Sequence, residues 1–345
     1  MKLVSFGEIM MRLTPPGYNR LRQTSSYDVC YGGAESNVAC SYACLGGNAS
    51  YVTTLPANEL GDAVLQMLRG IGVDVSHIRR GGPRLGVYYL ERGTGVRSSQ
   101  VVYDRAGSSF ATAEANTYDW DSALEGADWF FFTGITPALG PQVLRALENA
   151  LETARRLGVR VACDLNYRSK LWSEAEAGRV MRSLVQSVDL LIANEEHAER
   201  ILGVPSSVDP GFLGRGYEAE IAGRRENCTR MARFMCEHYP LQSVALTLRT
   251  TLSAEETVTG AVYYDGTCAV HSRDYRLYAA DRVGAGDAYA AGLLYSLSRG
   301  DSSSQANDFA AAACALAHTI PGDVSYVTSE EVERLVRDGS SRIRR

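Results

Sequence analysis

The sequence has no apolar run long enough to span a bilayer, which argues against a membrane protein. Its eight cysteines include no Cys-x-x-Cys pair and no Cys/His set with zinc spacing. Most of them lie in apolar runs, so we expect buried free thiols in a reducing cytoplasm. The net charge of −5 argues against a general binder of nucleic acid or membranes. The N-terminus shows no signal peptide, and we therefore expect a cytoplasmic protein.

The composition is that of an ordinary globular protein, with 45% hydrophobic and 22% charged residues in 345. From residue 128 onward, apolar strand patterns alternate with helical patterns, which is typical of a parallel α/β sheet. The expected strands are 129–132, 159–163, 188–193 and 243–248, and the expected helices are 141–157, 174–186 and 227–238. Residues 203–225 are rich in glycine, proline and serine and predict a surface insertion.

Polar clusters follow the ends of two of these strands. The first holds Asp164, Asn166 and Arg168, and the second holds Asn194 and Glu195. Parallel sheets carry their sites at the carboxyl ends of the strands. We therefore expect these five side chains to converge on one site.

The stretch from Asp281 to Asp287 contains a glycine turn, Gly284-Ala285-Gly286, followed by an apolar helical run. Such a turn exposes backbone N–H groups, and together with the helix dipole it favours bound anions. A carboxylate beside an anion site suggests proton handling, so Asp287 is a candidate general base. The alternative is an ordinary Asp N-cap after a glycine turn.

The motif Asp281-x-x-Gly284-Ala285-Gly286-Asp287 resembles the C-terminal signature of the ribokinase-like, phosphofructokinase-B-type sugar kinases. With Ser272-Arg273-x-Tyr275 upstream and the run 318–323 downstream, it resembles the 2-keto-3-deoxygluconate kinases of that family. The resemblance extends from Phe6 to about Val336. It implies one kinase domain over residues 1–345, with a three-layer α/β fold and a mostly parallel sheet. A small β-sheet lid, from about 12–31 and 84–106, is expected over the sugar.

The resemblance also implies a sugar site. It places the sugar against the Gly-Gly turn, so Gly33 and Asn37 become candidates, although a tight strand-to-helix turn also explains this motif. Tyr89, Tyr103 and Arg105, on two expected lid strands, would face the substrate. The alternative for these strands is an edge hairpin with tyrosines facing solvent.

On the opposite side of the sugar, Asn166 and Arg168 match the substrate motif of the family. A guanidinium grips a carboxylate through two hydrogen bonds and stays charged, so Arg168 is the candidate for a carboxylate of the substrate. A loop ion pair is the alternative for Arg168.

The sequence has no P-loop, so ATP would have to use the 284–287 turn. The resemblance implies further nucleotide contacts from Asn194, Thr247 and Arg249, with Gly284 and Gly286. The family motif Asn-x-x-Glu, linked to magnesium, has His197 at its fourth position here. Histidine is a poor ligand for Mg²⁺. Either Glu195 or Glu196 acts through water, or the magnesium contact is weaker than in relatives.

Together with these residues, the resemblance implies ATP-dependent phosphorylation of 2-keto-3-deoxy-D-gluconate at its C6 hydroxyl. Asp287 would be the base, and the N–H groups from Gly284 to Asp287, including Ala285 and Gly286, would form the anion hole. The expected partners are a small sugar acid, ATP with Mg²⁺, and a second copy of the chain in a homo-oligomer. Alternatives are a kinase for another sugar acid or a neutral ketose such as fructose, and a sugar-sensing homologue without turnover.

Overall fold

A nine-stranded sheet forms the centre of the protein, seen in a computed structural model that describes residues 1–207 and 217–339. The strand order is β14-β13-β12-β11-β10-β9-β1-β4, and β15 pairs with β13. In this sheet the neighbouring strands β4, β1, β9, β10, β11 and β12 are all parallel to one another. Strand β13 runs antiparallel to β12. The strands are β1 (Lys2–Phe6), β4 (Asn48–Val52), β9 (Trp129–Thr133), β10 (Arg160–Asp164), β11 (Leu190–Asn194), β12 (Ser243–Thr251), β13 (Glu256–Tyr264), β14 (Ala269–His271) and β15 (Tyr275–Tyr278).

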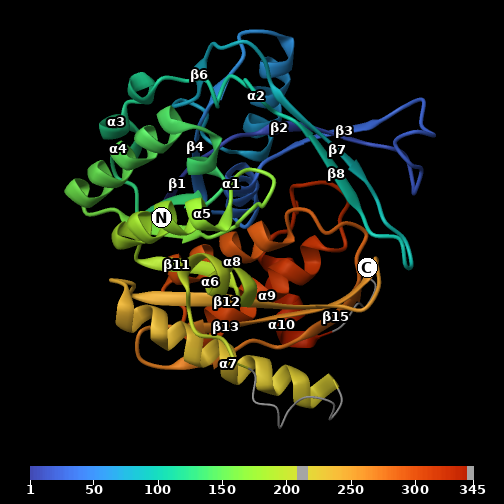
Figure 1. The fold of residues 1–345 in the computed structure, drawn as a ribbon, viewed down its shortest axis with the longest axis vertical. Coiled ribbons are helices and arrows are strands. Elements are labelled where there is room, and N and C mark those ends of the chain that lie inside the picture. The colour runs from blue at the N-terminus through green and yellow to red at the C-terminus, as the bar shows by residue number, and fades with distance from the viewer. Residues whose placement is uncertain (208–216, 340–345) are drawn as a thin grey trace.

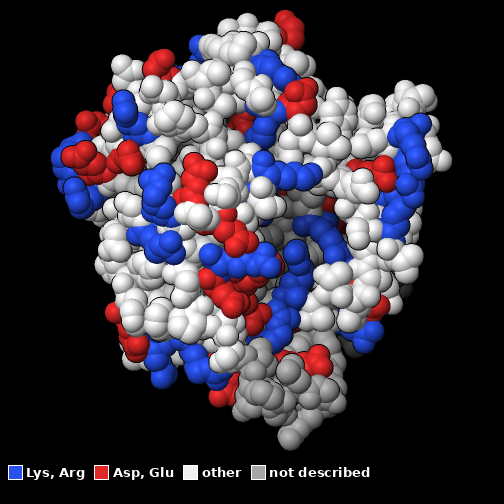
Figure 2. All heavy atoms as spheres, in the orientation of Figure 1, with Lys and Arg blue, Asp and Glu red and all other residues white. Residues whose placement is uncertain are grey.

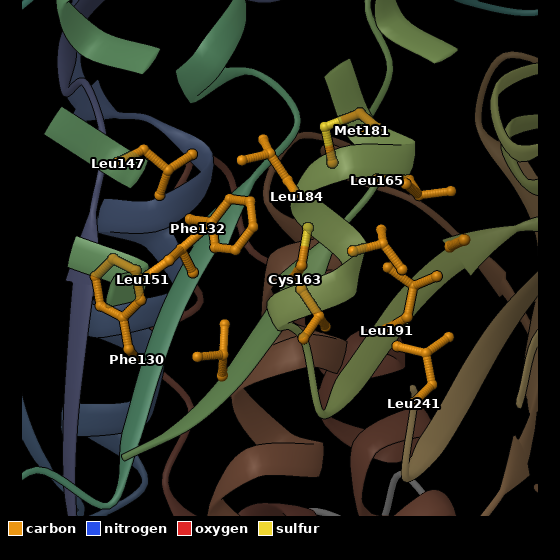
Figure 3. Packing of buried hydrophobic residues seen from close by; sticks show 14 of the residues in the cluster. Phe130, Phe132, Leu147, Leu151, Cys163, Leu165, Met181, Leu184, Leu191 and Leu241 are labelled. Carbon is orange, nitrogen blue, oxygen red and sulfur yellow. The ribbon is translucent and has the colours of Figure 1, made fainter. Parts of the chain in front are cut away.

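Both faces of this sheet are apolar, as strand β9 illustrates. Phe130 and Phe132 pack into one hydrophobic cluster, and Trp129 and Phe131 pack into the other. Successive side chains of a strand point to opposite faces, so a continuous apolar run indicates a strand covered on both sides. Figure 3 shows Phe130 and Phe132 among side chains of neighbouring helices and strands.

Helices cover the two faces, which makes the three layers that the sequence predicted (Figure 1). One face carries α3 (Trp120–Leu124), α4 (Pro141–Leu157), α5 (Glu174–Leu184), α6 (Glu195–Leu202) and α7 (Tyr217–His238). The other carries α1 (Ala34–Cys44), α2 (Glu59–Ile71), α8 (Ala285–Arg299) and α9 (Ser303–Ala317), and α10 (Ser329–Asp338) packs on α9.

A separate four-stranded sheet, called the small sheet below, projects from this body (Figure 1). Its strand order is β3 (Asp28–Gly32), β2 (Met10–Thr14), β7 (Gly86–Glu91) and β8 (Gln100–Asp104). A short two-stranded sheet joins β5 (Thr54–Leu55) and β6 (Arg79–Arg80). In the described part of the chain, no helix has the length and apolar character needed to cross a membrane.

The prediction of a surface insertion over residues 203–225 is wrong for residues 217–225, which are helical. Helix α7 begins at Tyr217 rather than at residue 227, and residues 208–216 lie outside the described residues. Charged residues such as Glu220, Arg224 and Glu226 hide the helical pattern, and none of residues 220–227 belongs to the apolar cluster. All eight cysteines are free; Cys40, Cys163, Cys228 and Cys314 are buried as expected, whereas Cys268 is exposed.

Candidate active site

A cavity of about 1460 Å³ lies between the carboxyl edge of the central sheet and the small sheet. Figure 2 shows a hollow in the surface beside the projecting part of the molecule, bordered by Lys and Arg side chains. Its wall combines side chains of β7 and β8 with the loop after β10, the junction of β11 and α6, strand β12 with the loop after it, and the turn before α8. Since single-ligand pockets measure roughly 300–1,000 Å³, the cavity has room for two ligands.

The glycine turn forms the start of α8, and Gly284 is its N-cap with a left-handed φ of 81°. A Cβ at Gly284 would lie 2.0 Å from the carbonyl oxygen of Asp323, so only glycine fits. The first N–H groups of a helix have no intrahelical acceptor, and Ala285 and Gly286 line the cavity. Asp287 follows in the first turn and makes no capping hydrogen bond, so the N-cap alternative is wrong.

Asp287 is partly buried at the cavity wall. Burial raises its pKa to about 7, and the nearby carboxylate of Asp164 acts in the same direction. The side-chain amide of Asn37 donates a hydrogen bond of 2.8 Å to Oδ2 of Asp287 and opposes this rise. Asp287 therefore exchanges its proton near neutral pH, as a general base requires.

Close contacts within the protein require glycine at both positions of the Gly32-Gly33 turn. A Cβ at Gly33 would lie 1.9 Å from the carbonyl oxygen of Glu8, and one at Gly32 would lie 2.0 Å from Oδ2 of Asp323. The tight-turn explanation therefore accounts for both glycines. Gly33 nonetheless lines the cavity, as does Asn37.

The convergence predicted at the strand ends is confirmed. All five residues line the same cavity: Asp164, Asn166, Arg168, Asn194 and Glu195. Asn166 has a left-handed φ of 33°, and its N–H donates a 3.0 Å hydrogen bond to Oδ1 of Asp164. Burial raises the pKa of Asp164 to about 6.

Of the two tyrosines predicted to face the sugar, Tyr103 lines the cavity and Tyr89 does not. The lining residue of β7 is Tyr88, whose hydroxyl donates to Oδ2 of Asp323. Tyr89 packs edge-on against Tyr27 instead. The prediction for Tyr89 is wrong because neighbouring strand residues face opposite sides of a sheet.

The two arginines predicted for the sugar site differ in their ion pairing. Arg105 donates from Nε to Oε2 of Glu8 at 2.8 Å, and its side chain is 10% exposed. Its charge is therefore already balanced by a buried carboxylate. Within the described residues Arg168 forms no ion pair, and its guanidinium donates to the carbonyl of Tyr167 at 3.2 Å. Of these two arginines, Arg168 is thus the one available to a carboxylate in the cavity.

Thr247 and Arg249, in the second half of β12, line the cavity, and their contact with a nucleotide stays a prediction. Asn194 is the N-cap of α6, and its Oδ1 accepts the N–H of His197 at 2.8 Å. Burial lowers the pKa of His197 to about 4, with Arg168 acting in the same direction. His197 is therefore neutral at pH 7.

The two predicted magnesium contacts both pair with arginines. Glu195 binds Arg224 of α7 through Oε2, and Glu196 lies 3.2 Å from Arg200. Within residues 1–207 and 217–339, no group of three or more acidic, His or Cys side chains is arranged to hold a metal ion. This donor set fits Mg²⁺ only where phosphate oxygens and water supply most of the ligands, as is common for Mg²⁺.

Several cavity residues escaped the sequence analysis as site residues, among them Glu8, Tyr88, Lys170 and Arg224. Lys170 donates to the carbonyl of Val101 at 2.7 Å and so connects the loop after β10 with the small sheet. Glu8 follows β1 at the site edge, and this position could have revealed it. Arg224 lies in the stretch interpreted as an insertion.

The comparisons define the class of protein. The pfkB family of carbohydrate kinases matches residues 1–230 and 241–328, so the chain belongs to this family. It is a carbohydrate kinase with the ribokinase-like fold.

Individual relatives match over nearly their whole length. A 2-dehydro-3-deoxygalactonokinase of Haloferax volcanii is 34% identical, covering 100% of this chain and 99% of the relative. A 2-dehydro-3-deoxygluconokinase of Thermoproteus tenax is 28% identical, covering 97% of this chain and 94% of the relative. The crystal structure of 2-dehydro-3-deoxygluconokinase from Thermotoga maritima is 44% identical and has a TM-score of 0.91, covering 97% and 98% of the two chains.

Proposed function

We propose that this kinase transfers the terminal phosphoryl group of ATP to the C6 hydroxyl of 2-keto-3-deoxy-D-gluconate. The similarity to two kinases named for this sugar acid, also called 2-dehydro-3-deoxygluconate, supports the substrate. The proposed phosphoryl transfer is supported mainly by the position and pKa of Asp287. Its carboxylate lies in the first turn of α8 and has a pKa of about 7.

In the proposed reaction, Asp287 takes the proton of the C6 hydroxyl as its oxygen attacks the γ-phosphorus. A new oxygen–phosphorus bond forms, the bond from the γ-phosphorus to the bridging oxygen breaks, and ADP leaves. The N–H groups of Ala285, Gly286 and Asp287, which have no acceptor within the helix, stabilise the negative charge of the transferring group together with N-cap Gly284. Such preorganised donors act without rearrangement at the moment of transfer.

The sugar acid is proposed to lie between the small sheet and the loop after β10. Arg168, which has no carboxylate partner among the described residues, is the candidate for the substrate carboxylate. Tyr103 and the balanced Arg105–Glu8 pair line the same part of the cavity. The small sheet would act as a lid over the sugar.

Thr247, Arg249 and Asn194 are proposed to face the nucleotide from the opposite end of the cavity. Arg249 supplies positive charge for the phosphates, which attract cationic side chains strongly. Mg²⁺ bound to the phosphates would offset charge on the transferring group. Glu195 is the candidate for an outer contact to its water ligands, and Glu196 is less suited because its side chain is 63% exposed.

The test is a panel of sugar acids and neutral ketoses with ATP, read as ADP release and by phosphate position in the product. We expect the largest kcat/KM for 2-keto-3-deoxy-D-gluconate and a 6-phosphate product. Glu8 balances the charge of Arg105, so of the two arginines proposed for the sugar site only Arg168 argues against a neutral ketose. A preference for fructose over every acid would overturn the substrate assignment and leave the kinase class intact.

A second candidate is the galactonate counterpart of this sugar acid. The 34% identity to a 2-dehydro-3-deoxygalactonokinase over the whole chain supports it. The same panel separates the two, since these sugars differ in the configuration of one hydroxyl. The homo-oligomer, the single domain over residues 1–345 and the cytoplasmic location stay predictions.

A further inference from the structure

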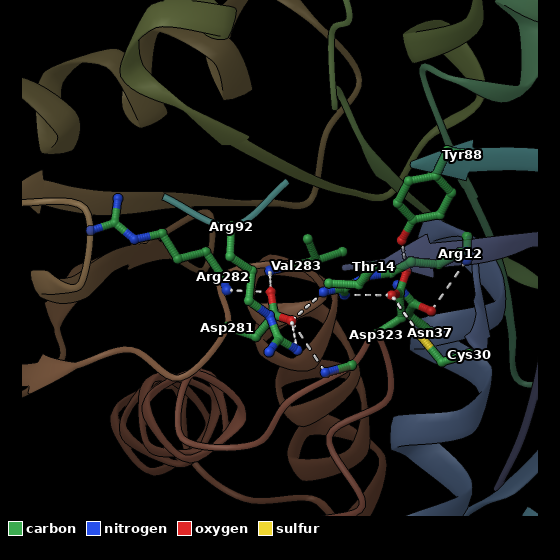
Figure 4. Close-up of polar contacts among 12 residues, drawn as sticks. Arg12, Thr14, Cys30, Asn37, Tyr88, Arg92, Asp281, Arg282, Val283 and Asp323 are labelled. Atoms are coloured by element: carbon green, nitrogen blue, oxygen red, sulfur yellow. Dashed lines mark hydrogen bonds and ion pairs between the residues drawn. The ribbon is translucent and has the colours of Figure 1, made fainter. Parts of the chain in front are cut away.

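Arg12 of β2 is a fully buried charge, with 0% of its side chain exposed. Its Nη1 donates to Oδ1 of Asp323 at 2.9 Å, its Nη2 binds Oδ2 of Asp281, and its Nε donates to Oγ1 of Thr14 at 2.9 Å (Figure 4). A buried charge is costly unless partners satisfy it on every side. Arg12 meets that condition with two carboxylates that come from distant parts of the chain.

The first carboxylate shapes the turn that enters the anion site. Oδ1 of Asp281 accepts the N–H groups of Arg282 at 2.8 Å and Val283 at 3.2 Å. Its Oδ2 accepts the N–H of Gly322 at 3.2 Å besides Arg12. Asp281 therefore directs the backbone into Gly284, the N-cap of α8.

The second carboxylate lies on the other side of the same turn. Asp323 binds Arg12 through Oδ1 and the hydroxyl of Tyr88 through Oδ2. Its carbonyl oxygen occupies the space that a Cβ of Gly284 would need. The position of Asp323 thus limits the position of Gly284.

Arg12 and Tyr88 both belong to the small sheet, whereas Asp281 and Asp323 flank the turn of residues 284–287, called the anion turn below. Apolar packing follows the same connection, because Val283 contacts a buried cluster on the small sheet that contains Met10, Tyr88 and Leu90. The small sheet and the anion turn are therefore joined by a satisfied charge network and by packing.

We propose that Arg12 is a positioning residue that fixes the Gly284–Asp287 turn relative to the sugar-facing side of the small sheet. The inference rests on the proposed role of this turn in phosphoryl transfer. Among the described residues that line the cavity, Arg12 is absent, so it acts through Asp281 and Asp323. Phosphoryl transfer depends on the alignment of hydroxyl and phosphorus, and a misplacement of 1 Å can reduce a rate by about 10²-fold.

The test replaces Arg12 with lysine, whose single ammonium cannot reach two carboxylates and Thr14 together. We expect kcat to fall about tenfold to 10²-fold, while KM for the sugar and binding of an ATP analogue change less than threefold. Thr14→Val, an isosteric change that removes only the acceptor of Nε, should give a smaller fall in kcat. Arg84→Lys is the matched control, because Arg84 pairs with Asp104 at the exposed side of the small sheet.

Chemical rescue separates positioning from folding. Guanidinium at millimolar, non-denaturing concentration should raise kcat of a folded Arg12→Ala variant several-fold and leave Arg84→Lys unchanged. If Arg12→Lys lowers the melting temperature but keeps kcat within twofold, or if guanidinium has no effect, Arg12 serves only the fold and the proposal is overturned. All rates are measured with the best sugar of the panel, so a wrong sugar-acid assignment does not alter this result.

Discussion

The side-chain amide of Asn37 joins two parts of the site that are far apart in the sequence. Its Nδ2 donates a 2.8 Å hydrogen bond to Oδ2 of Asp287, and its Oδ1 accepts the N–H of Gly33 at 3.2 Å. The sequence predicted Asn37 as a sugar contact, and the structure places its amide between the Gly-Gly turn and the proposed base. Hydrogen bonding to an ionised carboxylate favours the ionised form, so Asn37 keeps the pKa of Asp287 from rising further.

Replacement of Asn37 should therefore change the pH profile of the reaction. A hydrogen bond to a charged group contributes about 1.5–3 kcal/mol, and one pKa unit corresponds to about 1.36 kcal/mol. We expect Asn37→Leu to move the acid limb of kcat upward by about one to two pH units. An acid limb at its wild-type position would show that Asn37 does not act on Asp287.

Asp287→Asn tests the base directly. Loss of a general base lowers turnover by about 10²–10⁴-fold, whereas the backbone N–H groups that face the phosphates remain. Turnover is measured with saturating sugar and ATP, and binding of an ATP analogue is measured separately. Asp121→Asn, at an exposed site on α3, is the control. Activity within about threefold of wild type would remove Asp287 from the role of base.

The same variant should gain stability at high pH. The pKa of Asp287 is raised from its ordinary value of 3.8 to about 7 in the folded protein, mainly by burial. The folded state binds this proton more tightly than the unfolded state does, so ionisation destabilises the fold as pH rises from 4 to 7. Asp287→Asn should melt at a higher temperature than wild type at pH 8 and at the same temperature below pH 4. Equal melting temperatures at pH 8 would contradict the raised pKa.

Arg168 and Arg105 should respond differently to substitution. Arg168→Ala should lower kcat/KM for the sugar acid roughly tenfold or more, since about 1.4 kcal/mol corresponds to tenfold. Arg168→Lys should recover little, because an ammonium lacks the two-pronged geometry of a guanidinium. Activity on an analogue with the carboxylate reduced to an alcohol should start low and stay unchanged. An equal loss on the acid and the alcohol would exclude a carboxylate contact.

Arg105→Ala is the companion experiment. This change leaves the buried carboxylate of Glu8 without its arginine partner. We therefore expect it to lower kcat/KM for the acid and the alcohol alike and to lower the melting temperature. A loss confined to the sugar acid would instead make Arg105 a contact of the substrate carboxylate.

Magnesium dependence distinguishes the two glutamates after β11. Glu195→Gln should raise the Mg²⁺ concentration needed for half-maximal rate several-fold, because its carboxylate is only 16% exposed beside the cavity. Glu196→Gln, at an exposed site, is the matched control and should leave the requirement unchanged. No shift in either variant would remove both residues from the surroundings of the metal.

The fold class and most of the candidate site could be predicted from local patterns. Continuous apolar runs indicate strands covered on both faces. Helices α2 and α4 end at Gly72 and Gly158, both left-handed, and a glycine just after a helical pattern is a local signal for such an end. The rule that sites gather at the carboxyl ends of parallel strands located the residues after β10 and β11. These signals depend on neighbours in the sequence, and so the sequence carries them by itself.

Only the tertiary structure decided which charged groups meet. Arg12 binds carboxylates 269 and 311 residues away, and Arg105 binds Glu8 97 residues away. In β7 the alternation of side chains shows that Tyr88 and Tyr89 face opposite sides, but which side faces the cavity depends on the partner strands. The sequence determined which side chains are available at each strand end and turn. The packing of the small sheet against the anion turn decided which of their charges are balanced and which are free, because that balance depends on contacts between distant segments.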